Sequence, residues 1–399
     1  MKVFVVNCGS SSIKYQLFSM ATESVLAKGI VERVGQDGAK LTHAKGNGDR
    51  WQKEVKAPNH SAALALVVET LLDKETGVLS SIREIEGVGH RVVHGGEAIS
   101  GSAVIDQRVI DIIKDNARLA PLHNPANLSG IESAMAVIPH VPHVAVFDTA
   151  FLATLPPVAY RYAVPTEWYT EHHVRRYGFH GTSHRFVTQR SAEILGKSLD
   201  AVNLITVHLG NGCSMTAVAA GKAIDHSMGM TPLEGLVMGT RSGDIDPAVV
   251  LYMQREGATP AEIDKTLNSR SGLLGLSGKL SDMRDLLEQV AAGDKNAELA
   301  VQVFVYRIVK YIGAYHAILP GLDAVVLTGG IGENSLPIRR RICQSLARLG
   351  VVADDRRNEQ TRGGKAGAIT ADASRVPVWV VPTNEELMIA RDTASLAGK

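Results

Sequence analysis

The alternation of apolar and polar positions near the start of the chain predicts three β-strands in succession, at 2–7, 13–18 and 25–34, separated by turns rich in glycine and serine. The same pattern returns near the middle. A strand at 203–209 is followed by a glycine-rich turn, a second strand at 215–220 and the start of a third at 222–225. Two copies of one arrangement indicate an internal duplication.

Helical periodicity alternating with short apolar runs follows each triplet of strands. In the first half we expect helices at 61–73 and 106–119 and strands at 87–93 and 143–147. In the second half we expect a long helix at 296–319, a strand at 324–328, a helix ending near 350 and a strand at 376–381. Polar, glycine-bearing segments at 35–48 and 356–367 are expected to be loops.

This order predicts two α/β domains related by duplication, with a cleft between them. The last residues form a helix after position 383. A Ser/Thr-x-x-Glu capping box is expected at Thr383, with Glu386 in the third helical position, and another at Thr259 with Glu262. Ligands of open α/β sheets bind beyond the strand ends, so the polar turns there are the first candidates for a site.

Charge and composition narrow the class of protein. The 399 residues include 42 Lys plus Arg against 41 Asp plus Glu, and aromatic residues make up only 5%. This balance gives no basic surface for nucleic acid and no cationic face for a membrane. Three widely spaced cysteines, with no short-spaced pair, predict neither a disulfide framework nor a metal site and favour the cytoplasm. No apolar run is long enough to predict a signal peptide or a membrane span.

Three polar glycine turns that follow strands are the strongest chemical signals, at 7–14, 208–214 and 329–334. They bring backbone N–H groups, hydroxyls and, in the first, Lys14, which suits them to phosphate groups. A single such turn is more often an ordinary β-turn, but three at strand ends favour a nucleotide site. The sequence lacks a P-loop, since Ser191 stands where the first glycine would be, and lacks the third glycine of a dinucleotide fingerprint.

Positively charged side chains in glycine-rich surroundings are the next candidates. Arg91 and Arg241 lie in such segments, as does His180, although salt-bridge roles are equally typical of such arginines and a lone histidine is more often structural. Asp148 ends a strand, where either a catalytic or magnesium-binding carboxylate or a helix N-cap is expected. The histidine pairs 90/94 and 180/184 lie in turns and do not favour a zinc site.

Together, the segments at 7–14, 89–96, 147–151, 175–184, 208–214, 231–246, 329–334 and 383–387 resemble those of the acetate kinase family, in the acetate and sugar kinase/Hsp70/actin superfamily. The resemblance extends over essentially the whole chain. It implies duplicated actin-like (ribonuclease H-like) βββαβαβα domains with an inter-domain cleft. One domain would comprise 1–150 plus 384–399, and the other, which binds the nucleotide, 151–383.

The resemblance also implies a phosphotransferase that moves the γ-phosphoryl group of ATP to acetate, reversibly and by direct in-line transfer. Mg²⁺ is the implied cofactor, with Mn²⁺ able to substitute, and the implied assembly is a cytoplasmic homodimer. The implied catalytic residues are Asp148, His180, Arg241 and Arg91. The implied metal-binding residues are Asn7 and Glu385.

The remaining implied roles concern the two substrates. Arg91 would bind the acetate carboxylate, and an apolar methyl pocket would be formed by Val93, Leu122, Phe179 and Pro232. The implied nucleotide-binding residues are Lys14, His208, Leu209, Gly210, Asn211, Gly212, Asp282, Met283, Arg284, Gly330, Ile331, Gly332, Glu333 and Asn334.

Three alternatives remain open at this point. Propionate or butyrate kinase differs from acetate kinase only in the acceptor pocket, where one methylene group discriminates by only about 1–3 kcal/mol. A sugar kinase of the same fold would need a general base and a polar acceptor site. A nucleotide-switched binding protein like Hsp70 or actin would need a peptide-binding appendage or a polymer-forming surface.

Overall fold

The computed structural model describes residues 1–46, 48, 50–121 and 123–398. The chain divides into two compact units, unit 1 (Met1–Phe151 with Asn384–Lys399) and unit 2 (Leu152–Thr383). Among the described residues, no helix combines the length and the apolar character needed to cross a bilayer. The three cysteines are buried and unpaired.

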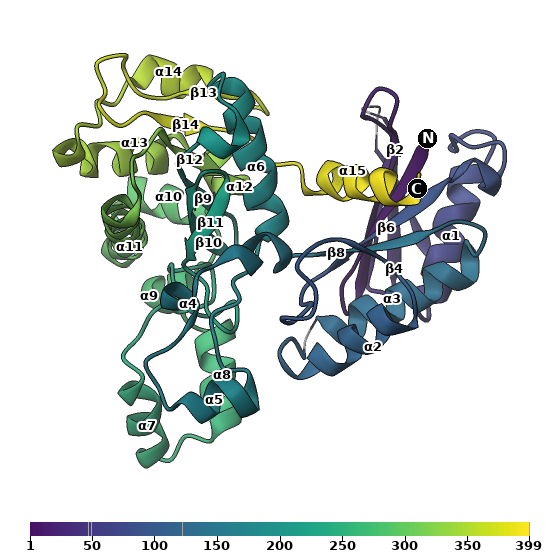
Figure 1. Ribbon diagram of the computed structural model, residues 1–399, viewed down its shortest axis with the longest axis horizontal. Helices are drawn as coiled ribbons and strands as arrows, with labels where there is room; N and C mark the ends of the chain where they lie inside the picture. The colour runs from purple at the N-terminus through teal and green to yellow at the C-terminus, as the bar shows by residue number, and fades with distance from the viewer. Residues whose placement is uncertain (47, 49, 122, 399) are drawn as a thin grey trace. The chain divides into compact units, whose positions relative to one another are not determined.

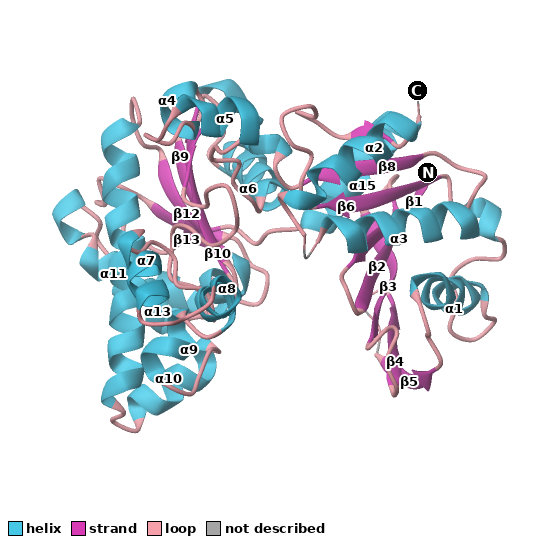
Figure 2. Ribbon diagram, turned by 90° about the horizontal axis from the view of Figure 1, so that it is seen from below, coloured by secondary structure: helices cyan, strands magenta, loops and turns pink. Residues whose placement is uncertain are grey.

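Unit 1 contains an eight-stranded sheet in the order β5-β4-β3-β2-β1-β6-β8-β7 (Figures 1 and 2). Its strands are β1 (Lys2–Cys8), β2 (Ser12–Ser19), β3 (Ser24–Glu32), β4 (Ala39–Lys45), β5 (Trp51–Val55), β6 (Gly87–Val92), β7 (Ala103–Val104) and β8 (His143–Phe147). Its α-helices are α1 (His60–Leu72), α2 (Gln107–Asp115), α3 (Asn124–Val137) and α15 (Glu385–Ala397).

One face of this sheet is covered by α1 and α3, which pack on each other and on β1, β2 and β6 (Figure 2). The apolar residues of β1 to β4 that point toward these helices form the main core of the unit. The C-terminal helix α15 packs on β1, β6 and β8 (Figure 1). Gly89 of β6 permits close approach, because a Cβ atom there would lie 2.4 Å from Thr393 Oγ1 and 2.6 Å from Ile389 Cγ2.

Unit 2 contains a six-stranded sheet in the order β11-β10-β9-β12-β14-β13. Its strands are β9 (Leu204–Leu209), β10 (Cys213–Ala219), β11 (Lys222–His226), β12 (Ala324–Thr328), β13 (Gly367–Ala368) and β14 (Val378–Val380). Its α-helices are α4 (Pro157–Tyr160), α5 (Thr166–His172), α6 (Gly181–Ile194), α7 (Ala248–Arg255), α8 (Pro260–Ser269), α9 (Gly272–Ser277), α10 (Met283–Ala291), α11 (Lys295–Ile318), α12 (Gly329–Asn334), α13 (Leu336–Ser345) and α14 (Asp355–Gln360).

The two sheets share one topology. In unit 1, β1 is antiparallel to β2, β2 is antiparallel to β3, and β1, β6 and β8 are parallel neighbours. In unit 2, β9, β10 and β11 repeat the antiparallel part, and β9, β12 and β14 repeat the parallel part. The α/β class and the duplication predicted from the sequence are therefore confirmed.

Two predicted loops were wrong. The segment 35–48 contains β4, whose residues Ala39, Leu41 and His43 alternate toward the core while polar residues separate them. The segment 356–367 begins inside α14, whose N-cap is Asp354 and whose Asn358 is buried. Glycine-rich flanks concealed the strand, and the shortness of the helix concealed its period.

Candidate active site

The residues expected to carry chemistry fall into two groups, one in each unit. In unit 1 the group lies at the carboxyl ends of the parallel strands β1, β6 and β8. Arg91 of β6 pairs in register with Val146 of β8, and Asp148 follows directly after β8. The parallel arrangement thus brings a guanidinium and a carboxylate from distant parts of the sequence to adjacent strand ends.

Arg91 and Asp148 form a charge-assisted pair. Arg91 Nε and Nη2 donate to Asp148 Oδ2 at 3.0 and 2.6 Å. The Asp148 side chain is 1% exposed and that of Arg91 is 27% exposed, so the guanidinium retains a face open to solvent. The Asp148 carboxylate raises the pKa of Arg91 and keeps it protonated. This cation is held in place by a buried partner and can bind an anionic substrate.

Glu385, in the first turn of α15, is electrostatically coupled to this pair. Burial raises the pKa of Glu385, as do the neighbouring carboxylates of Asp148 and Glu386, whereas Arg91 and Lys14 lower it. Clustered carboxylates repel one another, and a divalent cation relieves such repulsion. The group therefore has the charge expected of a site for a hard cation.

The turns that carry these residues are held together by α3, which the sequence interpretation overlooked. Asn127 Nδ2 donates to the carbonyl of Cys8, and Asn127 Oδ1 accepts from the N–H of Val93. Asn124 Oδ1 accepts from the N–H of His94, and its Nδ2 donates to the carbonyl of the same residue. Two asparagines three residues apart, both on the buried face of the helix, were the available signal.

Asn7 lies near the end of β1 and pairs in register with Lys14 of β2. Gly9 N–H donates to the carbonyl of Ser12 at 2.8 Å and closes the turn between the two strands. Lys14 is exposed. Val93, assigned to the methyl pocket, is 6% exposed. Leu122, assigned to the same pocket, lies outside the described residues.

In unit 2, His180 and Arg241 converge on the turn between β9 and β10. His180 occupies the N-cap of α6 with a left-handed backbone (φ 58°), a conformation uncommon for a residue other than glycine and enriched at functional positions. A Cβ atom at Gly212 would lie 2.6 Å from Arg241 Nη2 and 3.4 Å from His180 Cε1. Glycine at 212 thus lets both side chains approach the turn backbone.

A network of hydroxyl groups and histidines orients His180. His180 Nδ1 and His184 Nε2 each lie 2.8 Å from Ser214 Oγ, and the rings of His180 and His208 stack with centroids 4.5 Å apart. His184 is fully buried, and burial lowers its pKa well below the usual value. Burial likewise lowers the pKa of Arg241, whose Nη1 donates to the carbonyl of Pro232.

Pro232 and Phe179 were both assigned to the methyl pocket. Phe179 is 3% exposed, and its N–H donates to His226 Nε2. Both residues therefore lie next to the pair of Arg241 and His180: the carbonyl of Pro232 accepts a hydrogen bond from Arg241, and Phe179 directly precedes His180.

Three segments expected to bind the nucleotide line one pocket of about 560 Å³ in unit 2. Its size falls in the range of small-molecule sites. The lining residues are Gly210, Asn211, Ser281, Asp282, Met283, Arg284, Leu287, Gly330, Ile331, Asn334, Ser335 and Pro337. Arg284 pairs with Asp282 at the start of α10 through two hydrogen bonds, of 3.0 and 2.7 Å.

Other residues assigned to the nucleotide site are neighbours in sequence of residues that line this pocket but do not line it themselves. Leu209 is fully buried, and Gly332 packs against Leu327. Glu333 Oε1 accepts from the N–H groups of Gly329 and Thr383 at 2.9 and 3.1 Å. Glu333 therefore ties the junction of β12 and α12 to the backbone of Thr383.

The capping box expected at Thr383 was wrong. Asn384 is the N-cap of α15, and its side chain accepts from Leu387 N–H. Thr383 instead accepts a hydrogen bond from Ser183 Oγ, while its own N–H is bound by Glu333. The capping box at Thr259 is confirmed.

Arg339 is a further residue that sequence reasoning missed. Its side chain is fully buried on α13. Nη1 donates to the carbonyl of Glu333 at 2.8 Å, and Nε and Nη2 donate to Asn358 Oδ1 and to the carbonyl of Asn358, each at 2.7 Å. Arg339 thus ties the end of α12, which helps to line the 560 Å³ pocket, to α14.

Comparison with known proteins decides the family. The model of the Acetokinase family matches residues 2–391. The chain belongs to this family. The acetate kinase of Thermotoga petrophila is 54% identical over 401 aligned residues, covering 100% of this chain and 99% of that protein. The acetate kinase of Dictyoglomus thermophilum is 51% identical over 400 residues, with 100% of both chains covered.

Solved structures of family members have the same fold. The crystal structure of Porphyromonas gingivalis acetate kinase matches with a TM-score of 0.95 and 47% identity, covering 99% of each chain. The structure of a propionate kinase from Francisella tularensis matches with a TM-score of 0.93 and 41% identity, also covering 99% of each chain. The predicted family, the actin-like fold and kinase activity are therefore confirmed.

Proposed function

We propose that this member of the acetokinase family is an acetate kinase, which transfers the γ-phosphoryl group of ATP to acetate in a reversible, direct in-line reaction. The proposal rests above all on the family match across residues 2–391. It is supported by a cationic side chain, Arg91, fixed by buried Asp148 at adjacent strand ends. Both groups of side chains would serve this one reaction.

Arg91 would bind the acetate carboxylate through the part of its guanidinium that faces solvent. Carboxylic acids have pKa values of about 4–5 and are ionised at neutral pH, so the acceptor needs no general base. Asp148 would therefore orient Arg91 and organise the metal rather than accept a proton. Its buried position and its two hydrogen bonds from Arg91 support this role.

Asn7 and Glu385 would hold Mg²⁺, with Mn²⁺ as a substitute. Within the described parts of the chain, no group of three or more His, Cys, Asp and Glu side chains forms a metal cluster. Mg²⁺ is bound in many kinases by one or two protein oxygens together with substrate phosphates, and an amide and a carboxylate fit that pattern. When bound, the ion would neutralise charge on the nucleotide phosphates.

The transferring phosphoryl group carries negative charge that positively charged groups must stabilise. Arg241 and His180, which meet at Gly212, would do so from unit 2. Lys14 would contact the nucleotide phosphates from unit 1. The 560 Å³ pocket of unit 2 would hold the rest of the nucleotide.

The apolar surroundings expected for the acceptor favour a short unbranched acid. Val93 and Phe179 are apolar and buried, whereas a sugar acceptor would require hydrogen-bonding side chains there. Propionate is the nearest alternative, because a propionate kinase is also 41% identical to this chain. A single methylene group is worth only about 1–3 kcal/mol, so both acids are expected to react, with acetate preferred.

A direct assay tests the proposal. The protein is incubated with MgATP and a series of short acids, and acyl phosphate is trapped with hydroxylamine. Acetate should give the highest kcat/KM. Absence of hydroxamate with every acid would refute acyl kinase activity, and a higher kcat/KM for propionate would reassign the acceptor.

Substitution of Arg91 tests the acceptor site. Arg91→Ala should raise the KM for acetate and lower turnover, and ADP affinity measured by calorimetry should stay nearly unchanged. Arg108→Ala, on α2, is the matched control, because Arg108 is exposed. A normal acetate KM in Arg91→Ala would contradict the assignment.

Asp148→Asn separates metal organisation from proton transfer. The substitution should shift the Mg²⁺ concentration needed for half-maximal activity and the directly measured affinity for Mn²⁺. Loss of activity at every metal concentration, with normal Mn²⁺ affinity, would instead favour a different catalytic role for Asp148.

The proposed assembly is a homodimer in the cytoplasm, a compartment in which free cysteines such as these stay reduced. Helix α7 supports the dimer, since it has no buried residue and its Leu251 and Tyr252 are 55% and 56% exposed. Exposed apolar surface of this kind suits a second copy of the chain. Light scattering should give a dimer that Leu251→Asp dissociates; a monomeric wild-type protein would refute the proposal.

A further inference from the structure

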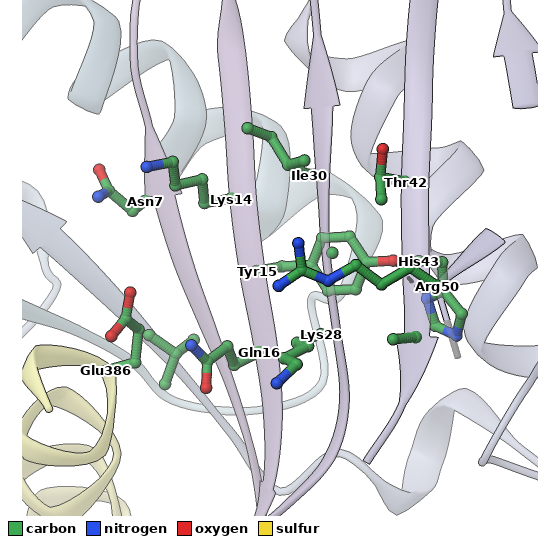
Figure 3. A pocket seen from close by; sticks show the side chains of 13 residues that line it. Asn7, Lys14, Tyr15, Gln16, Lys28, Ile30, Thr42, His43, Arg50 and Glu386 are labelled. Atoms are coloured by element: carbon green, nitrogen blue, oxygen red, sulfur yellow. Dashed lines mark hydrogen bonds between the residues drawn. The ribbon is translucent and has the colours of Figure 1, made fainter. Parts of the chain in front are cut away.

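Unit 1 contains a pocket of its own, on the sheet face opposite to α1 and α3. A pocket of about 320 Å³ lies over strands β1 to β4 (Figure 3). Its lining residues are Val5, Asn7, Lys14, Tyr15, Gln16, Lys28, Gly29, Ile30, Thr42, His43, Ala44, Arg50 and Glu386. The assigned roles described above use only Asn7 and Lys14 from this set.

Strand register explains why cations gather on this face. Lys14 pairs with Ile30, and Gln16 pairs with Lys28. Lys14 and Lys28 therefore occupy diagonal positions on neighbouring strands, with Cβ atoms about 7–8 Å apart. Both point away from the core, because the intervening Tyr15 is buried on the opposite face.

Strand register also places Arg50 close to Lys28. Lys28 pairs with Ala44 of β4, and continuing the β4–β5 register by one residue sets Arg50 opposite Ala44. Ala44 presents no long side chain, so Arg50 can extend over it. Figure 3 shows the Arg50 side chain running across the pocket toward the side on which Lys14 and Lys28 lie.

Two of the three cations lack a neutralising partner in the part of the chain that the structure describes. Within the described residues, neither Lys28 nor Arg50 forms an ion pair or a side-chain hydrogen bond. Glu386, at the α15 side of the pocket, contributes one negative charge against three positive ones. Arg391 and Lys2 of the same unit do pair, with Glu23 and Glu84 respectively.

The floor of the pocket is rigid. Tyr15 Oη lies 2.6 Å from His43 Nδ1, and His43 Nε2 lies 3.0 Å from the carbonyl of Thr76. This buried network lies beneath the floor and fixes β2 and β4 on either side of Gly29. A rigid floor pre-organises the cations above it and lowers the entropic cost of binding.

We propose that this pocket binds an anion carrying at least two phosphoryl groups, free or as part of a phosphorylated metabolite. Lysine ammonium and arginine guanidinium groups are the side chains that best bind phosphate oxygens. Three cations distributed over β2, β3 and the edge of β5 match two linked phosphoryl groups, whereas a single carboxylate would reach only part of them. The site lies entirely within unit 1.

Binding here would also affect the reaction, a consequence that rests on the proposed function. An anion that engages Lys14 withdraws this side chain from the nucleotide phosphates. The ligand would therefore inhibit, and ATP would oppose it. The binding test below does not depend on catalysis, so the two proposals can fail separately.

The test is calorimetric titration of the full-length protein with inorganic pyrophosphate in metal-free buffer. The double variant Lys28→Ala/Arg50→Ala should weaken pyrophosphate binding at least tenfold. Lys53→Ala is the matched control. Lys53 is exposed on β5 but pairs with Leu41, whose side chain points toward the core and not into the pocket. The affinity of this variant for pyrophosphate should stay within twofold of wild type. Thermal unfolding verifies that each variant is folded.

A second variant locates the ligand. Asn211→Ala alters the pocket of unit 2 and should leave pyrophosphate binding unchanged. Parallel titrations with orthophosphate and with a sugar bisphosphate distinguish the ligand class: orthophosphate should bind at least tenfold more weakly than pyrophosphate, and tighter binding of the bisphosphate would identify a metabolite. The proposal is overturned if wild type binds no pyrophosphate, if Lys28→Ala/Arg50→Ala binds it normally, if Asn211→Ala weakens it tenfold, or if orthophosphate binds equally well.

Discussion

Replacing Arg339 by methionine should destabilise unit 2 and loosen its 560 Å³ pocket, the proposed nucleotide site. Methionine is close to arginine in length and apolar, so it fills much of the buried volume but donates no hydrogen bond. The change would leave two acceptors without their donor, the carbonyl of Glu333 and the side-chain oxygen of Asn358, whereas the carbonyl of Asn358 keeps the N–H of Thr361. Removing one side of a buried polar contact leaves the other side unsatisfied.

The expected cost follows from these contacts. An unsatisfied buried polar group costs about 1–3 kcal/mol, and the lower part of that range for two groups gives about 2–4 kcal/mol. Burial lowers the pKa of Arg339 only to about 10, so the side chain is charged at neutral pH and its hydrogen bonds are charge-assisted. If about 1 kcal/mol of the loss reaches α12, the Kd for ADP rises about fivefold.

Urea unfolding followed by circular dichroism measures the first effect, and calorimetric titration with ADP measures the second. Arg340→Met is the matched control on the same helix. Arg340 pairs with Asp355 at 2.6 Å, but both side chains are exposed, so its loss should cost below about 1 kcal/mol. An Arg339→Met protein as stable as Arg340→Met would refute the reasoning.

Two further predictions concern the free energy of unfolding. Gly29→Ala should lower it by about 2–3 kcal/mol, because the added Cβ would lie 2.4 Å from the carbonyl oxygen of Thr42 and 2.5 Å from Tyr15 Oη. Gly101→Ala is the control: open space surrounds Gly101, so urea unfolding should change by less than about 0.5 kcal/mol, and equal effects of the two substitutions would contradict the packing argument. Burial lowers the pKa of His184 and of His226 well below the usual value, with neighbouring His226 and His208 adding to the shift of the first and Arg176 to that of the second. Unfolding therefore takes up protons below about pH 6.5, and thermal stability should fall on acidification from pH 7.5 to 5.5, by up to about 1.4 kcal/mol per pH unit for each histidine; a midpoint that does not fall would contradict this assignment.

Much of the sheet architecture could be predicted from the sequence because it is encoded locally. The first strand triplet was predicted at 2–7, 13–18 and 25–34, and the structure has β1, β2 and β3 within two residues of these bounds. Runs of β-branched residues broken by glycine mark such strands whatever lies around them. Strand β4 was missed because its inward positions include small Ala39 and polar His43, so its alternation resembles a loop.

Less of the candidate active site could be predicted from the sequence. The strand-end turns pointed to phosphate chemistry, but the roles of Arg91 and Asp148 came from family resemblance, since spacing alone does not reveal that β6 and β8 are neighbours. The residues that hold the turns, Asn127 and Arg339, carry no sequence motif. Their roles depend on hydrogen bonds to backbone groups distant in the sequence, which only the folded chain brings together.

Unit 1 is built from two parts of the chain that are far apart in the sequence, and this affects the order in which the protein folds during synthesis. Helix α15, which packs on β1, β6 and β8, is translated after the whole of unit 2. Its buried residues Leu387, Ile389 and Ala390 cover a sheet whose strands left the ribosome long before. Domains usually fold in the order of their synthesis. Here the sheet of unit 1 lacks the cover of α15 until the chain has been made almost to its end, so we expect unit 1 to complete its folding only after unit 2 has been synthesised.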